Sequence, residues 1–217
     1  MFIQLLTNSP ILALAWLAAI LISLTAHEFA HAYVGTKLGD VTAEQYGRLT
    51  LNPLAHIDLF GFIPLLLFGF GWAKPVPFNP YNLQNPQWDS VKIALAGPVA
   101  NIILALSGAI VMRALNASGL LVTMGELSFF LSLLILINLM LLLFNLIPVH
   151  PLDGSKLLDA LMTRSPYLEI RNAIAYYGPR VLMFSVLISV FLDIKVFGFI
   201  TVPAYWICHL ISGGLVC

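Results

Sequence analysis

Long hydrophobic runs, separated by a few charged positions, dominate the pattern of this chain. Residues 11–26, 93–112 and 127–149 carry no charged side chain, and each run approaches the roughly 20 apolar residues that a membrane-spanning helix needs. A fourth run, 172–192, holds a single charge, and a fifth, 196–217, contains a proline and a histidine. The pattern predicts an all-α polytopic membrane protein, a bundle of about four to six transmembrane helices.

Two segments depart from this pattern. Residues 59–73 are apolar but short and broken by glycines and a proline, which favours a re-entrant segment over a full span. Residues 40–53 are polar, with β-forming residues at alternating positions, and they predict a short β-hairpin at the membrane surface. An irregular connecting loop fits the same stretch about equally well.

Composition supports the membrane assignment. The chain is 60% hydrophobic and 9% charged, whereas soluble domains average about 25% charged residues. A lipid bilayer is therefore the expected surroundings, and the net charge of zero gives no indication of nucleic-acid binding. We expect one integral-membrane domain over residues 1–217, with a core at about 9–160 and C-terminal helices at about 172–212.

The positions of Lys and Arg predict an orientation. If the N-terminus is outside, eight of the ten Lys and Arg residues are cytoplasmic, and only Arg113 and Lys195 are not. This bias is the usual sign of the cytoplasmic side.

The first span carries the candidate chemistry in "HEFAH", residues 27–31. His27 and His31 are four residues apart, so they share one helix face and can hold one metal ion. Glu28 is one position on, beside the metal and free to accept a proton from water, which is the arrangement of H-E-x-x-H zinc proteases. Ionisable residues inside a span are costly and usually functional, which favours this reading over headgroup contact at a helix end.

A catalytic zinc ion usually has three protein ligands. The end of the third span, "NLIPVHPLDG", offers His150 and Asp153 nearby, and Asp159 follows. Two prolines and Gly154 make a stiff turn there that could aim the Asp153 carboxylate back into the bundle. Taken alone, the same residues are typical of an ordinary turn.

"HEFAH" and "NLIPVHPLDG" together resemble the site-2 protease family of intramembrane zinc metalloproteases, whose patterns are H-E-x-x-H and N-x-x-P-x-x-P-L-D-G. "AGPVAN", residues 96–101, resembles another segment of that family. The resemblance covers about residues 15–160. It points to the compact prokaryotic branch without PDZ or CBS domains, and hence to a prokaryotic cell membrane. The bias of Lys and Arg places the active site toward the cytoplasmic side of that membrane.

The resemblance implies a role for each matching residue. His27, His31 and Asp153 would bind one zinc ion per chain, and Glu28 would be the general base. Asn145 would stabilise the oxyanion or position the substrate. Asn101 is a weaker candidate for substrate binding, because a buried amide that bonds between helices explains it as well. His56 and His150 are not ligands in the family; we expect both in loops at the membrane interface, where contact with substrate is the alternative. His209 is expected to be structural.

The expected substrates are transmembrane segments of other proteins, cleaved in regulated intramembrane proteolysis. Because a helix hides its amides in internal hydrogen bonds, an unwound substrate needs replacement partners, and our hypothesis is that a strand edge supplies them. Val41, Leu49 and Leu51 of the predicted hairpin are the candidates for that edge.

Three other functions use part of the same pattern. These are a membrane metal transporter, a catalytically inactive membrane scaffold and a prenyl-protein processing protease. No acidic ladder follows the spans, no expected catalytic residue is missing, and "PLDG" departs from the third class. The sequence leaves the oligomeric state open.

Overall fold

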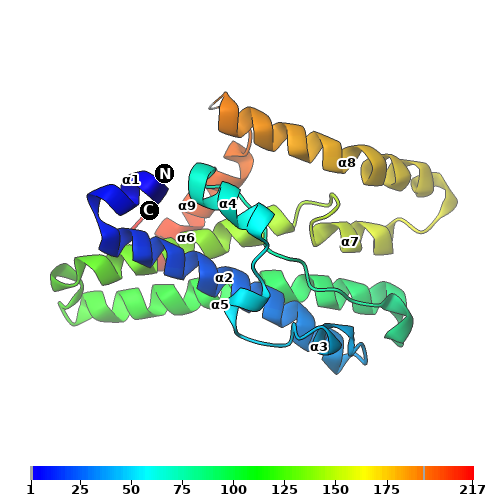
Figure 1. The fold of residues 1–217 in the computed structure, drawn as a ribbon, viewed down its shortest axis with the longest axis horizontal. Coiled ribbons are helices and arrows are strands. Elements are labelled where there is room, and N and C mark those ends of the chain that lie inside the picture. Colours follow the sequence, from blue (N-terminus) through cyan, green and yellow to red (C-terminus); the bar gives the residue numbers. More distant parts are fainter. Residues whose placement is uncertain (1, 193) are drawn as a thin grey trace.

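The computed structural model describes residues 2–192 and 194–217, and the regular elements among them are helices (Figure 1). The α-helices are α1 (Phe2–Asn8), α2 (Pro10–Lys37), α3 (Thr42–Gln45), α4 (Leu59–Phe68), α5 (Pro86–Ala117), α6 (Gly125–Asn145), α7 (Gly154–Leu161), α8 (Ser165–Phe191) and α9 (Gly198–Ser212). Three short 3-10 helices join them: η1 (Pro53–Ala55), η2 (Pro80–Asn82) and η3 (Leu121–Thr123).

The centre of the molecule is a bundle of α2, α5 and α6, each packed against the other two, with α9 against α5 and α6. Small and branched side chains fill the space between α5, α6 and α9: Ala105, Ala109, Met112, Leu131, Ile135, Leu139, Ala204 and Cys208. Helices of this kind pack closely in membranes where small residues let the backbones approach. The bundle is the frame that fixes the residues of the site.

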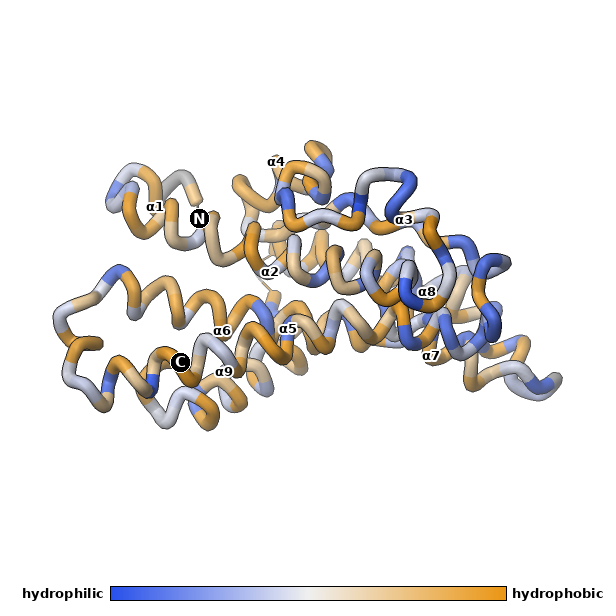
Figure 2. The backbone as a smooth tube through the Cα atoms, turned by 90° about the horizontal axis from the view of Figure 1, so that it is seen from below, coloured by the Kyte–Doolittle hydropathy of each residue, from blue (hydrophilic) through white to orange (hydrophobic). Residues whose placement is uncertain are grey.

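Within the described residues, four helices are long and apolar enough to cross a membrane: α2, α5, α6 and α8. Two shorter apolar helices, α4 and α9, accompany them. The prediction of an all-helical membrane protein with about four to six such helices is therefore confirmed. Hydrophilic positions gather at the end that holds α3 and α7, whereas the helices of the bundle are mostly hydrophobic (Figure 2).

Helix α8 stands apart from the bundle (Figure 1). Only 6% of its most apolar stretch is buried in the protein, against 28–44% for the other three long helices. Its apolar side chains are suited to lipid, because a helix that is hydrophobic all round needs an apolar environment.

The predicted β-hairpin at residues 41–51 is wrong. The chain forms α3 here, after Asp40 accepts hydrogen bonds from the backbone N–H and hydroxyl of Thr42 at 3.1 Å and 2.5 Å. The rest of the segment wraps around the buried Arg48, whose Nη1 donates to the carbonyl of Ala55 at 2.5 Å. Side-chain hydrogen bonds of this kind compete with strand ladders, and the pattern of β-forming residues was too weak a signal against them.

The predicted re-entrant segment at 59–73 is not supported either. Residues 59–68 form α4, ten residues long with Pro64 inside it, and Gly69 ends it with φ 77°. Residues 70–79, which we call the strap, then run without regular structure across the bundle to η2. A re-entrant segment needs a second limb that returns beside the first, whereas the described residues after α4 form the strap.

Candidate metal centre

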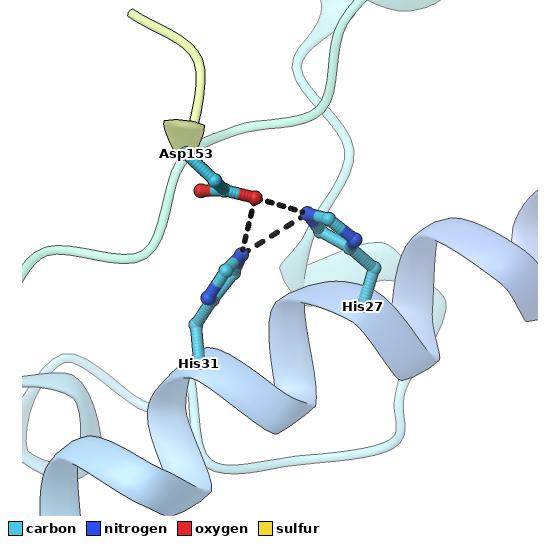
Figure 3. Close-up of side chains that lie close together, drawn as sticks. All are labelled: His27, His31 and Asp153. Carbon is cyan, nitrogen blue, oxygen red and sulfur yellow. Dashed lines mark hydrogen bonds and ion pairs between the residues drawn. The ribbon is translucent and has the colours of Figure 1, made fainter. Parts of the chain in front are cut away.

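The two histidines of α2 point in one direction, as their spacing predicted. Both are buried, at 5% and 8% exposure for His27 and His31, and their Nε2 atoms are 3.0 Å apart. Figure 3 shows both rings turned toward Asp153. This convergence follows from the four-residue spacing on one helix.

Asp153 reaches the histidines from the turn between α6 and α7. Its Oδ2 lies 3.2 Å from Nε2 of His27 and 3.4 Å from Nε2 of His31 (Figure 3). Gly154 permits the tight turn, since a Cβ there would be 2.4 Å from the carbonyl oxygen of Leu146. The sequence prediction of a turn that aims this carboxylate into the bundle agrees with this geometry.

The three atoms fit a zinc ion. Zinc takes nitrogen and oxygen ligands at about 2.0–2.2 Å, which places tetrahedral ligands about 3.3–3.6 Å from one another. The Asp153 distances, 3.2 Å and 3.4 Å, are close to this spacing, and the pair of histidine nitrogens is slightly closer. The buried Oδ2 of Asp153 has no hydrogen-bond donor among the described residues. Three converging lone-pair atoms therefore present a ligand set for a cation.

Each imidazole is held from behind. Nδ1 of His31 donates to the carbonyl of Ile93 on α5 at 2.7 Å, and Nδ1 of His27 lies 2.6 Å from Oδ1 of Asn101 on the same helix. A hydrogen bond at Nδ1 leaves Nε2 free for a metal. Asn101 thus lies behind His27, fully buried, and does not line the cavity.

Gly97 of α5 lies directly against the two rings. A Cβ at this position would be 2.5 Å from Cε1 of His27 and 2.5 Å from Nε2 of His31. The absence of a side chain therefore makes room for both imidazoles between α2 and α5.

Glu28 faces the cavity of about 400 Å³ that the ligand residues also line. It is 9% exposed, and its Oε2 accepts a hydrogen bond from the backbone N–H of Val76 in the strap at 3.2 Å. The carboxylate is thus beside the ligand set but not part of it. Asn145 lines the same cavity, and its Nδ2 donates to the carbonyl of Leu141 at 3.0 Å.

The strap forms one wall of this cavity, through Gly71, Trp72, Ala73, Pro75, Val76 and Phe78. It is fixed at its middle and at its C-terminal end. The backbone N–H of Lys74 donates to the carbonyl of His56 at 2.8 Å, and the backbone N–H of Asn79 donates to Oδ2 of Asp40 at 2.7 Å. Burial raises the pKa of the Asp40 carboxyl, but hydrogen bonds from Thr42, Asn82 and Asn79 outweigh burial and lower it. The anchor is therefore ionised at neutral pH.

The residues expected at a hairpin edge lie elsewhere. Val41 and Leu51 are exposed, and neither these two nor Leu49 lines the cavity. Sequence reasoning missed the strap residue Val76 and also Lys156 of α7, which lines the cavity with its Nζ 5.6 Å from the Phe78 ring centroid. The run of prolines in residues 75–80 was the available signal for an extended wall.

The other histidines stay out of the ligand set. His150 tethers its own turn to α7, with Nε2 3.3 Å from Oδ2 of Asp159 and Nδ1 3.2 Å from Oγ of Ser155. Nε2 of His56 donates to the carbonyl of Thr50 at 2.9 Å. His209 lies on α9, near the other end of the bundle.

Known proteins resemble this chain in sequence. The model of peptidase family M50 matches residues 106–187. The Bacillus subtilis protein YwhC, named as a zinc metalloprotease, is 42% identical over 160 residues, which cover 72% of this chain and 73% of YwhC. The chain belongs to peptidase family M50. This is the site-2 protease family of intramembrane zinc metalloproteases, as the two motifs indicated.

More distant relatives carry similar names. Rip2 of Mycolicibacterium smegmatis is 33% identical over 64% of this chain and 53% of its own length. MJ0611 of Methanocaldococcus jannaschii is 34% identical over 61% of this chain and 62% of its own length. Both are named as zinc metalloproteases, and this chain spans only part of each. No solved structure matched this M50 chain.

Proposed function

We propose that this M50 chain is a zinc endopeptidase that hydrolyses peptide bonds in or near the transmembrane segments of other proteins. His27, His31 and Asp153 are its metal ligands, and Glu28 is its general base. The observation that carries the proposal is the set of three ligand atoms within 4.8 Å of one another, on the wall of a cavity that Glu28 shares.

Each residue around the cavity has a separate role in the proposed hydrolysis. Zinc, when bound, supplies a Lewis acid that lowers the pKa of water to about 7. The Glu28 carboxylate takes the proton from the attacking water and returns it to the leaving amine. The Asn145 amide, which lines the same cavity, donates its second hydrogen to the carbonyl oxygen as negative charge develops there. The apolar strap and α6 keep bulk water away from the reacting bond.

The metal assignment predicts a difference between two aspartates. Asp153→Ala is expected to lose most of its zinc and its activity, because only two protein ligands remain. Asp159→Ala, which removes the carboxylate that forms an ion pair with His150, is expected to keep both. The measurements are the zinc content of purified protein and cleavage of a co-expressed single-span protein. Full zinc retention in Asp153→Ala would remove that residue from the site.

The strap is the better candidate for the edge that receives an unwound substrate. Ala73 forms an isolated antiparallel bridge with Ile57, flanked by the bond from Lys74 N–H to the His56 carbonyl. In such a pair the N–H and C=O of Ala73 point to the opposite edge, and no described residue bonds to them. An extended substrate can therefore pair with the strap beside the metal centre.

Disulfide cross-linking tests this placement. A cysteine at Ala73 is expected to cross-link to a substrate with one cysteine near its cleavage site, in the Glu28→Gln background that leaves the substrate intact. The native cysteines do not interfere, since Cys208 and Cys217 are bonded to each other. Leu51→Cys is the matched control from the segment first expected to form the edge. Cross-links at position 51 in place of position 73 would return the edge to that segment.

The active site faces the cytoplasm of a prokaryotic cell in this proposal. The distant end of α5 supports this orientation. Arg113 there donates to the carbonyl of Ile211 at 3.4 Å, beside the chain end that carries the Cys208–Cys217 disulfide. Disulfides persist in oxidising compartments outside the cytoplasm. Relatives from bacteria and an archaeon support a prokaryotic membrane.

Thiol labelling of intact cells tests the orientation. Gln45→Cys in α3 is expected to be protected from a membrane-impermeant thiol reagent added outside, and to react after the cells are opened. A cysteine at Ser118, just after α5, is the matched control and is expected to react in intact cells. The reverse labelling pattern would invert the proposed orientation.

A further inference from the structure

A line of buried polar side chains runs from His27 across the three-helix bundle. Nδ2 of Asn101 on α5 donates to Oδ1 of Asn138 on α6 at 2.7 Å, and Nδ2 of Asn138 donates to Oγ of Ser23 on α2 at 2.8 Å. All three residues are 0% exposed. Polar groups at this depth are costly, so their alignment behind one metal ligand calls for a physical reason.

The direction of the hydrogen bonds along this line is fixed by backbone carbonyls. Nδ2 of Asn138 also lies 2.7 Å from the carbonyl of Leu134, which can only accept. The amide of Asn138 must therefore point its nitrogen at Leu134 and its oxygen at Asn101. Asn101 in turn points its nitrogen at Asn138 and its oxygen at His27.

At the His27 end of this line, the imidazole must donate the hydrogen bond to Asn101. Because Oδ1 of Asn101 can only accept, Nδ1 of neutral His27 must carry the proton and Nε2 must carry the lone pair. His31 reaches the same state by one bond to the Ile93 carbonyl. His27 depends on a side-chain amide that could otherwise turn over, and Asn138 prevents this.

We propose that Asn138 is a positioning residue of the metal centre, which fixes the tautomer of His27 through Asn101 without contacting ligand, metal or substrate. Ser23 supports it from the far side, where its hydroxyl donates to the carbonyl of Ala19 at 2.7 Å. The inference rests on the proposed role of His27 as a zinc ligand. Partners of metal-binding histidines typically change metal affinity by about 10- to 100-fold.

The test measures zinc affinity of the full chain in detergent by competition with a chelator. Asn138→Leu is expected to weaken zinc binding by about 10- to 100-fold, because Asn101 is then free to turn its nitrogen toward His27. Ser23→Ala is expected to change it little, since the Leu134 carbonyl still orients Asn138. Ser132→Ala on α6, which removes a hydroxyl that donates to the carbonyl of Ser128 in its own helix, is the matched control.

A second substitution separates positioning from simple packing. A carboxylate at position 101 accepts from His27 whichever way it turns, so Asn101→Asp added to Asn138→Leu is expected to restore most of the zinc affinity. With Asn138 in place, the same Asn101→Asp change sets an oxygen against Oδ1 of Asn138 and is expected to weaken binding. A role in helix packing alone predicts no such reversal of sign.

The outcomes separate this inference from the proposed function. Restored zinc binding in the double variant supports the tautomer role, with thermal unfolding of the metal-free proteins showing that each is folded. Unchanged zinc binding in Asn138→Leu, or no recovery in the double variant, overturns it. If Asn138→Leu does not fold, the Asn101→Asp variant decides. Zinc affinity of Asn101→Asp equal to that of the wild type would then overturn the positioning role of Asn138. Unchanged zinc binding in His27→Ala would refute the ligand assignment itself.

Discussion

Glu28→Gln is expected to abolish cleavage of single-span substrate proteins while the purified chain keeps its zinc. The amide has nearly the shape of the carboxylate but cannot take a proton from water, and a positioned general base typically contributes about 10²- to 10⁴-fold. Its oxygen can still accept from the Val76 N–H, which Glu28 binds at 3.2 Å, so the strap should stay in place.

Co-expression with a panel of host single-span proteins measures this loss, and elemental analysis measures the zinc. Glu126→Gln, at the first turn of α6 and outside the cavity, is the matched control with the same chemical change. Turnover by Glu28→Gln within a few-fold of the wild type would assign proton transfer to another group.

Gly97→Ala is expected to lose zinc and activity together, although Gly97 binds nothing. Its new methyl group would lie 2.5 Å from Nε2 of His31 and 2.7 Å from Nε2 of His27, in the space where the ligand atoms converge. Neither ring can move away cheaply, since each is bonded at Nδ1 to α5 itself. Overpacking in a closed interior typically costs about 1–3 kcal/mol. Here it would displace the two imidazole nitrogens from the positions that bind zinc.

Gly35→Ala is the control for this variant, because the nearest atom to a Cβ there is 3.8 Å away on Ile93. It adds the same methyl group near the same helix pair. Zinc content and thermal unfolding with and without a chelator are the measurements. A Gly97→Ala protein with wild-type zinc content would show that α2 and α5 separate more easily than the packing indicates.

The ligand set was predictable because each of its members obeys a local rule. Helical spacing brought His27 and His31 together, and the turn chemistry around Gly154 aimed Asp153. The membrane-spanning helices were predictable from sequence as well, because an uncharged hydrophobic run of about 20 residues is a strong local signal. The resemblance to the M50 family added the proposed role of Glu28 as the general base.

The sequence predictions were wrong where contacts between distant residues determine the local structure. The segment after α2 has strand-forming residues, but the buried Arg48 and Asp40 organise it through side-chain bonds to distant backbone groups. No local pattern shows those partners. Asn138 did leave a signal, as one of two asparagines in the uncharged run 127–149. A polar residue at mid-span needs a partner, and that reasoning could have singled it out.

The metal centre's place along α5 bears on what becomes of the cleaved chain. His31 bonds to Ile93, twenty residues before Arg113 on one helix, which is about 30 Å at 1.5 Å per residue and matches the thickness of a bilayer core. In the proposed function, hydrolysis at this metal centre therefore takes place at the boundary of the hydrocarbon. We expect one fragment to leave with few apolar residues and dissolve in water, and the other to keep nearly a whole span and stay anchored.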